Sequence, residues 1–152
     1  AAAGMWDEVI KMRKVMEDQS GAKEPGRSWI EIGGEIHSFV SDDKLHPRQE
    51  EICKELKSLH LQMKKIGYVP DTRYVFHNVG EVEKEHALCH HSERLAIAIG
   101  LISTPPETPI TITKNLRVCG DCHTATKFIS KITKRLIIAR DANGFHHFQN
   151  GV

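Results

Sequence analysis

Two short motifs, well separated along the chain, constrain its fold more than any other feature. His91 and Glu93 flank a serine, and Cys119 and Cys122 form a Cys-x-x-Cys pair. Imidazole nitrogens and thiolates are ligands that proteins offer to zinc, usually in tetrahedral geometry. If both motifs bind one ion, the intervening chain must bring the starts of two segments together. The fold must therefore place residues 91–93 beside residues 119–122.

Local geometry places each motif at the beginning of a helix. Residues three apart share a helix face, so Cys119 and Cys122 can hold one ion. A helix N-terminus also offers free N–H groups and a positive potential, which favour the thiolate. His91 and Glu93 are two apart, hence about 200° around a regular helix. They can serve one site only at the first turn.

The combination favours a catalytic metal over a structural one. A catalytic zinc has three protein ligands and leaves the fourth position to water. In zinc nucleobase deaminases a His and two Cys hold the ion, and a Glu carries protons without binding it. Here zinc-bound hydroxide would attack C4 of cytosine, with Glu93 as general base and then general acid. The alternative is a structural zinc module that binds RNA or partner proteins, closed by His90 or Glu93.

The first half of the chain carries regular hydrophobic patterns. Residues 28–40 alternate around Gly33-Gly34, which predicts a β-hairpin with a tight turn. Residues 5–16 have the spacing of an amphipathic helix. A second helix is predicted between residues 47 and 67, with an inward stripe of Ile52, Leu56, Leu59 and Met63.

The second half predicts helices and strands in alternation. One helix is expected over roughly 86–99, ending at Gly100, and another begins at Cys119. Strands are expected at 110–113, 136–139 and 145–148, with a short candidate at 74–76. This order predicts an α/β fold with one mixed sheet covered by helices on both sides.

Bulk properties fit one domain with a short appendage. At 152 residues and a formal net charge of +1, the chain gives no global signal for nucleic acid. No apolar run is long enough to cross a membrane. Cys53 and Cys89 are expected to be ordinary, partly buried thiols rather than parts of a disulfide framework. The absence of an initiator Met indicates a piece cut from a longer protein.

Further motifs in the sequence resemble those of a known protein family. They are Pro25-Gly26-Arg27-Ser28-Trp29-Ile30-Glu31, His46-Pro47, Gly67-Tyr68-Val69-Pro70-Asp71-Thr72, His90-His91-Ser92-Glu93-Arg94-Leu95-Ala96, Asn115-Leu116-Arg117-Val118-Cys119-Gly120-Asp121-Cys122-His123, Arg140-Asp141 and Phe145-His146-His147-Phe148. Over residues 25–152 the chain resembles the DYW domain of plant pentatricopeptide repeat proteins, including its PG box. Val118 replaces the proline of the general deaminase signature, which argues against an ordinary free-nucleoside deaminase, and it is usual in DYW domains. Residues 1–24 resemble the end of the helical E-type motif that precedes the domain.

The resemblance implies a cytidine deaminase-like fold and zinc-dependent C-to-U editing of organellar RNA, in a chloroplast or mitochondrion. It implies zinc at His91, Cys119 and Cys122, with Glu93 as proton shuttle. It also implies single-stranded RNA as substrate, read by pentatricopeptide repeats upstream in the same chain. Other editing factors would be further partners, and no membrane is involved.

The family pattern includes a second, structural zinc. It is held there with a C-terminal Cys-x-Cys that precedes an Asp-Tyr-Trp-like terminus, whereas this sequence stops at Gly151-Val152. His123 and His146 are the candidate ligands that remain. Two histidines alone make a poor zinc site. Either this second metal is absent or the true C-terminus has been trimmed.

A local excess of cations flanks the Cys-x-x-Cys pair. From Lys114 to Arg140 the chain has seven Lys or Arg residues and one acid, Asp121. Such a surface would bind RNA phosphates in a salt-dependent way. The RNA-binding candidates are Lys114, Arg117, Lys127 and Lys131. A plain solvated helix face is the equal alternative for each of them.

Residues 68–86 form a segment that a minimal deaminase core does not need. Because they immediately precede the His91 motif, they are expected to form a regulatory insertion that covers or exposes the site. Glu81, Glu83 and Glu85 at its end would repel RNA if they lay over the mouth. An ordinary surface loop is the alternative.

Overall fold

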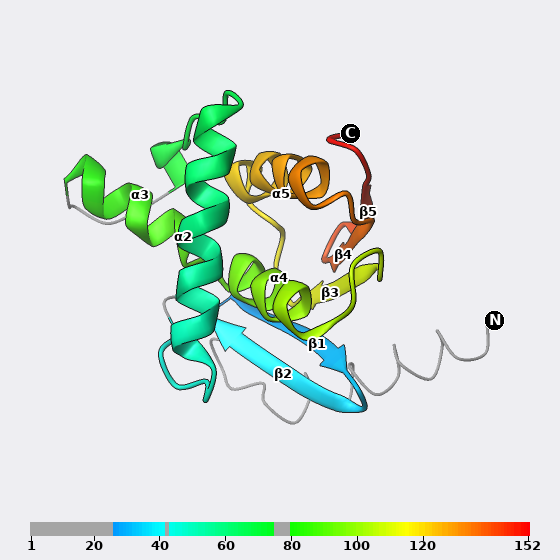
Figure 1. Cartoon of the computed structure of the whole chain (residues 1–152). Helices are drawn as coiled ribbons and strands as arrows, with labels where there is room; N and C mark the ends of the chain where they lie inside the picture. Colours follow the sequence, from blue (N-terminus) through cyan, green and yellow to red (C-terminus); the bar gives the residue numbers. More distant parts are fainter. Residues whose placement is uncertain (1–25, 42, 75–79) are drawn as a thin grey trace.

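The computed structural model describes residues 26–41, 43–74 and 80–152 (Figure 1). The helix expected at residues 5–16, and with it the E-type segment 1–24, lies outside them. In chain order the elements are β1 (Arg27–Ile32), β2 (Glu35–Val40), α2 (Gln49–Lys65), the 3-10 helix η1 (Thr72–Tyr74), α3 (Glu81–Cys89), α4 (Ser92–Ser103), β3 (Ile110–Lys114), α5 (Gly120–Thr133), β4 (Ile137–Asp141) and β5 (Gly144–Phe148).

The five strands form one mixed sheet in the order β2-β1-β3-β4-β5. β3 and β4 pair in parallel, and the other neighbours pair antiparallel. A parallel pair needs a crossover connection, which α5 supplies. The N-terminus of α5 therefore follows the carboxyl end of β3. The expected mixed α/β sheet is confirmed.

α4 is the central helix of the domain. All residues from Ser92 to Leu101 are buried, which identifies a helix enclosed on every side. Figure 1 shows it over β1 and β3, both of which it contacts. A Cβ atom on Gly100 would lie 2.7 Å from Cδ1 of Ile30, so glycine permits this close approach. The expected helix end at Gly100 is wrong, because the helix continues to Ser103.

One hydrophobic core joins α2, α4 and α5 to the inward side chains of the sheet. The opposite face of the sheet presents Thr111, Ile138 and Phe145, which are exposed or half-buried. Within the described residues the helices thus cover one face of the sheet, whereas helices were expected on both sides. No helix in this part of the chain has the length and apolar character needed to cross a membrane.

The N-terminal hairpin and the first described helix agree with the sequence patterns. The turn between β1 and β2 consists of Gly33 and Gly34, with φ values of 57° and 84°. These values lie in the left-handed region that favours glycine. The inward side of α2 is formed by the four predicted side chains, which are buried: Ile52, Leu56, Leu59 and Met63.

The region around the His91 motif differs from the prediction of one helix over 86–99. α3 ends at Cys89, the chain turns at His90 and His91, and α4 begins at Ser92. The acidic stretch of the expected irregular segment forms the first part of α3. Tyr74, expected in a short strand, belongs to η1, and the rest of that candidate strand lies outside the described residues.

Candidate functional site

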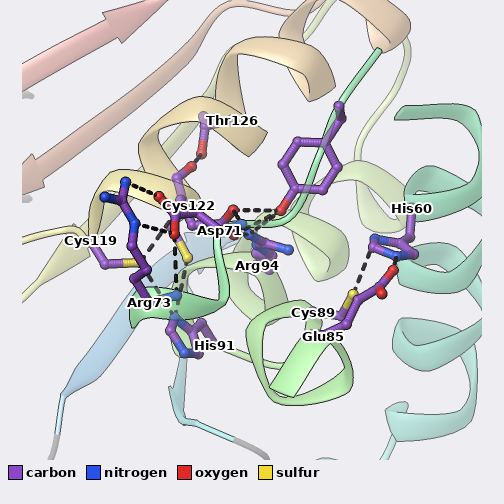
Figure 2. A network of polar contacts seen from close by, with 12 residues as sticks. His60, Asp71, Arg73, Glu85, Cys89, His91, Arg94, Cys119, Cys122 and Thr126 are labelled. Carbon is purple, nitrogen blue, oxygen red and sulfur yellow. Dashed lines mark hydrogen bonds and ion pairs between the residues drawn. The ribbon is translucent and has the colours of Figure 1, made fainter. Parts of the chain in front are cut away.

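Three side chains of the two motifs converge on one point. Nδ1 of His91 lies 3.6 Å from Sγ of Cys119 and 3.3 Å from Sγ of Cys122. Figure 2 shows the imidazole directed at both sulfur atoms. A tetrahedral zinc with ordinary bond lengths would separate a nitrogen and a sulfur ligand by about 3.5 Å. The cluster therefore has the dimensions of a zinc site as well as the ligand chemistry.

Two helix starts place these ligands. His91 is the N-cap of α4 and Cys119 the N-cap of α5, both with extended backbone angles. Sγ of Cys119 accepts a hydrogen bond from the backbone N–H of Cys122 at 3.4 Å. The predicted placement of each motif at a first helical turn is therefore the observed one. The positive ends of both helices favour negative charge on the ligands.

The two thiols differ in acidity. The hydrogen bond with the Cys122 thiol, helped by His91, outweighs burial and lowers the pKa of Cys119 to about 5. The same hydrogen bond, together with complete burial, raises the pKa of Cys122 well above that of a free thiol. Without metal, Cys119 is thus the thiolate at neutral pH and Cys122 keeps its proton. Zinc binding requires both thiolates and would release that proton.

Glu93 lies in the first turn of α4, beside the cluster, with a side chain only 1% exposed. Its Oε1 forms an ion pair with Nζ of Lys114 at the end of β3. Its Oε2 is buried and has no hydrogen-bond partner among the described residues. A buried, unpaired carboxylate oxygen is costly in a site that is only structural. An oxygen of this kind can accept a proton, which a site that is only structural would not need.

The position of His90 argues against a fourth protein ligand. Its Nδ1 lies 2.9 Å from the carbonyl oxygen of His86, and its Nε2 lies 3.9 Å from Sγ of Cys53 on α2. Within the described residues, the metal-ligand cluster contains His91, Cys119 and Cys122 alone. The residues present therefore fit a zinc ion with three protein ligands and one open position.

A buried charge network lies directly behind the ligands. Asp121, between the two cysteines, forms an ion pair with Arg94, the neighbour of Glu93, and both side chains are 1% exposed. Tyr68 donates to both carboxylate oxygens of Asp121, at 2.9 and 2.7 Å, and the N–H of Asp71 donates to Oδ1 at 2.7 Å. Burial would lower the pKa of Arg94, but interactions with Cys122, Tyr68 and Asp121 outweigh burial and raise this pKa, so the guanidinium group stays charged.

Sequence reasoning missed this network. The ion pair could have been predicted from two opposite charges, Arg94 and Asp121, that stand inside the two motifs. Both motifs were expected at the starts of helices packed in the core. Charged residues are almost never fully buried without a partner, so each required one. The network also ties residues 68–71 of the expected insertion to the first turn of α5.

The candidate RNA-binding cations are spread over different environments. Arg117 and Lys131 are exposed, Lys127 is half-buried, and Lys114 is occupied by Glu93. Another cation of the same stretch, Arg135, is buried. It donates to the carbonyl oxygens of Leu101 and Thr104 at the end of α4.

The candidate second-site histidines lie next to each other. The ring centroids of His123 and His146 are 5.4 Å apart, and Nε2 of His146 is 3.1 Å from Oδ1 of Asp141. Burial, with Lys127 nearby, lowers the pKa of His123 and favours the neutral imidazole. Neutral imidazole is the form that binds metal.

A separate polar cluster joins α3 to α2 (Figure 2). Nε2 of His60 lies 2.6 Å from Oε1 of Glu85, which also accepts from Nζ of Lys64 at 2.7 Å. Nδ1 of His60 lies 3.2 Å from Sγ of Cys89. Burial raises the pKa of Cys89, so this thiol is not activated. Cys53 and Cys89 are both half-buried free thiols, as predicted.

Known proteins with similar sequences contain the region that carries this cluster. A chloroplastic pentatricopeptide repeat-containing protein of Arabidopsis thaliana is 55% identical over 99% of this chain and 17% of its own length. A mitochondrial one from the same plant is 47% identical over 99% of this chain and 24% of its own length. The chain thus spans about a fifth of the length of these relatives. The family model for the DYW family of nucleic acid deaminases matches residues 67–152, which include every ligand of the cluster, and the chain belongs to this family.

Proposed function

We propose that this chain is a zinc-dependent RNA cytidine deaminase domain that converts cytidine to uridine in organellar transcripts. The observation that carries the proposal is the free, buried Oε2 of Glu93 beside a three-ligand cluster. A structural zinc would be closed by a fourth ligand and would need no free carboxylate oxygen. Membership of a nucleic acid deaminase family supports the same reading.

His91, Cys119 and Cys122 would hold the ion. When bound, zinc supplies Lewis-acid activation of a water molecule at neutral pH. Oε2 of Glu93 accepts one proton from the water molecule and delivers it to N3 of the pyrimidine ring. After the water oxygen has added at C4, Glu93 takes the proton of the new C4 hydroxyl and passes it to the departing amine. The C4–N bond breaks, ammonia leaves, and a uracil base remains in the RNA. The buried network of Arg94 and Asp121 fixes the two helix starts that carry these groups.

Single-stranded RNA is the proposed substrate, because the reacting base must leave the stack to reach such a site. The relatives are named as pentatricopeptide repeat proteins of chloroplasts and mitochondria. We place this chain in one of these organelles and assign target recognition to repeats upstream of it. Lys127, Lys131 and Arg117 are the proposed phosphate contacts.

Two further assignments belong to this proposal. His123 and His146, with ligands from beyond residue 152, would hold a second, structural zinc. Residues 68–86 would regulate access to the catalytic site, a role supported by the hydrogen bonds of Tyr68 and Asp71 to Asp121. Tethering this segment should then change both deamination and metal access. If it changed neither, the segment would be an ordinary surface loop.

The test combines metal content with chemistry. Zinc is measured by elemental analysis in the wild type, Glu93→Gln and Cys122→Ala, and each full-length protein is incubated with total chloroplast or mitochondrial RNA, which is then sequenced. We expect equal zinc contents in the first two proteins and about one zinc fewer per molecule in the third. Conversion should occur only with the wild type. Zinc lost from Glu93→Gln would make Glu93 a ligand and contradict the mechanism.

A further inference from the structure

Lys114 is placed inside the site rather than on its surface. Its side chain is 11% exposed, against 1% for that of Glu93, and the two form an ion pair. Desolvating a carboxylate is expensive unless a cation compensates it. Of the two oxygens of Glu93, the pair occupies Oε1 and leaves Oε2 unpaired among the described residues. Lys114 thereby determines which oxygen remains for proton transfer.

The first strand of the N-terminal hairpin holds the backbone of Lys114. Ser28 of β1 is its partner in the register of β1 and β3. One residue further, Oδ1 of Asn115 accepts from the N–H of Arg27 at 2.8 Å, and the N–H of Asn115 donates to the carbonyl oxygen of Arg27 at 3.2 Å. These contacts fix the point from which the lysine side chain extends.

The same strand holds the other side of the ion pair. Oγ of Ser28 and Oγ of Ser92 share a buried hydrogen bond of 2.9 Å. Ser92 is the first residue of α4 and the neighbour of Glu93. Ser28 is therefore bonded to the start of α4 and lies opposite Lys114 in the sheet. A shift of β1 would move both partners of the pair.

Gly26 lies against the lysine side chain itself. A Cβ atom at this position would lie 3.4 Å from Cε and 3.7 Å from Nζ of Lys114. Alanine would thus make an ordinary contact, whereas a branched side chain would occupy the path of the lysine. Gly26 thus packs directly against the lysine side chain whose ammonium group pairs with Glu93.

We propose that Lys114 is a positioning residue for the Glu93 carboxylate, and that residues 26–28 of the hairpin hold this pair in its working geometry. The inference rests on the proposed deaminase function. It gives the hairpin a chemical role at the site, although the hairpin contributes no metal ligand. It also assigns Lys114 to Glu93 rather than to an RNA phosphate.

The first experiment measures kcat and KM of the full-length protein on a transcript that the wild type edits. We expect Lys114→Met to lower kcat about tenfold or more, with KM within about threefold of the wild type and zinc content unchanged. Lys114→Arg restores a cation and should recover part of kcat. Lys57→Met, which removes an exposed cation on α2, is the matched control. A higher KM with normal kcat would instead assign Lys114 to RNA and overturn the proposal.

The hairpin is tested by two substitutions at one position. Gly26→Val should reproduce the loss of kcat seen in Lys114→Met, and Gly26→Ala should lower kcat much less. Equal behaviour of the two variants would refute the role of the hairpin. Because both keep the ligands, zinc content serves as the check that the site itself is intact.

A second readout needs no turnover. Trace acetylation with acetic anhydride, quantified by mass spectrometry, reports how freely each lysine reacts. In the zinc-loaded wild type we expect Lys114 to react much more slowly than Lys57, and Glu93→Gln should remove most of that protection. Equal reactivity of Lys114 in both proteins would show that no ion pair exists. A wild type that fails to edit would contradict the proposed function instead, so the two failures are distinguishable.

Discussion

At the scale of single residues, substitutions in the buried ion pair of Arg94 and Asp121 should have the largest effect on stability. Removing one partner of a buried pair leaves the other charge uncompensated, which costs about 3–5 kcal/mol. Asp121→Asn should therefore lower the free energy of unfolding by this order. Tyr68→Phe, which removes one hydroxyl from the same network, should cost only about 0.5–1.5 kcal/mol. Urea denaturation of the zinc-loaded proteins measures both.

The two variants separate the effect of the carboxylate charge from that of an ordinary hydrogen bond. If Asp121→Asn were no more harmful than Tyr68→Phe, the carboxylate charge would not be what keeps Arg94 buried. Asp121 lies between Cys119 and Cys122 in the sequence, so its substitution could weaken zinc binding as well as the fold. Measuring the zinc content separates these two effects. A stable variant that no longer binds zinc would assign Asp121 to the metal site rather than to the fold.

Residue roles that depend on local spacing could be predicted, and those that depend on register could not. His91, Cys119 and Cys122 are placed by the first turns of two helices, so their spacing was informative. The pairing of Lys114 with Glu93 depends on how β3 lies beside α4, which no local pattern encodes. For the same reason Lys114 was assigned to the RNA-binding cations.

At the scale of elements, the break between α3 and α4 could not be predicted from the periodicity of the apolar residues. Inward residues recur on both sides of it, Leu88 before and Leu95 after, so one helix was expected. The hairpin and α2 were predictable because glycine turns and apolar stripes are local signals. The break puts His91 at the N-cap of α4, a position that the spacing of His91 and Glu93 favours but that no hydrophobic pattern marks.

α3 is attached to α2 by Glu85, and this attachment can be tested. The hydrogen bond from Lys64, and then that with His60, lowers the pKa of Glu85. Its ionised form therefore stabilises the folded state above the ordinary glutamate pKa, and this contribution is lost as pH falls through the lowered value. Glu85→Gln should increase hydrogen exchange of α3 at pH 7. The difference from the wild type should shrink as the pH falls below the ordinary glutamate pKa of about 4.3, and it should disappear below the lowered pKa of Glu85.

An acidic residue on α2 provides the control. Glu51 pairs with Arg48, the N-cap of the same helix, and this pair does not include a residue of α3. Glu51→Gln should leave exchange in α3 unchanged over the same pH range. Equal effects of the two substitutions would mean that the loss of any acid loosens α3, and Glu85 would not be the specific attachment.

At the scale of the whole molecule, metal and fold are coupled through two helix starts. His91 is the N-cap of α4 and Cys122 lies in α5, so a bound zinc would link one helix that precedes β3 in the sequence to one that follows it. Binding only to the folded state stabilises it by about 4 kcal/mol when free zinc exceeds Kd a thousandfold. For a domain of this size that corresponds to a rise in Tm of roughly 10 °C. Calorimetry with and without a chelator measures this shift in the wild type. Cys53→Ser should keep the shift and Cys122→Ala should lose it, whereas a full shift in Cys122→Ala would place the stabilising metal elsewhere.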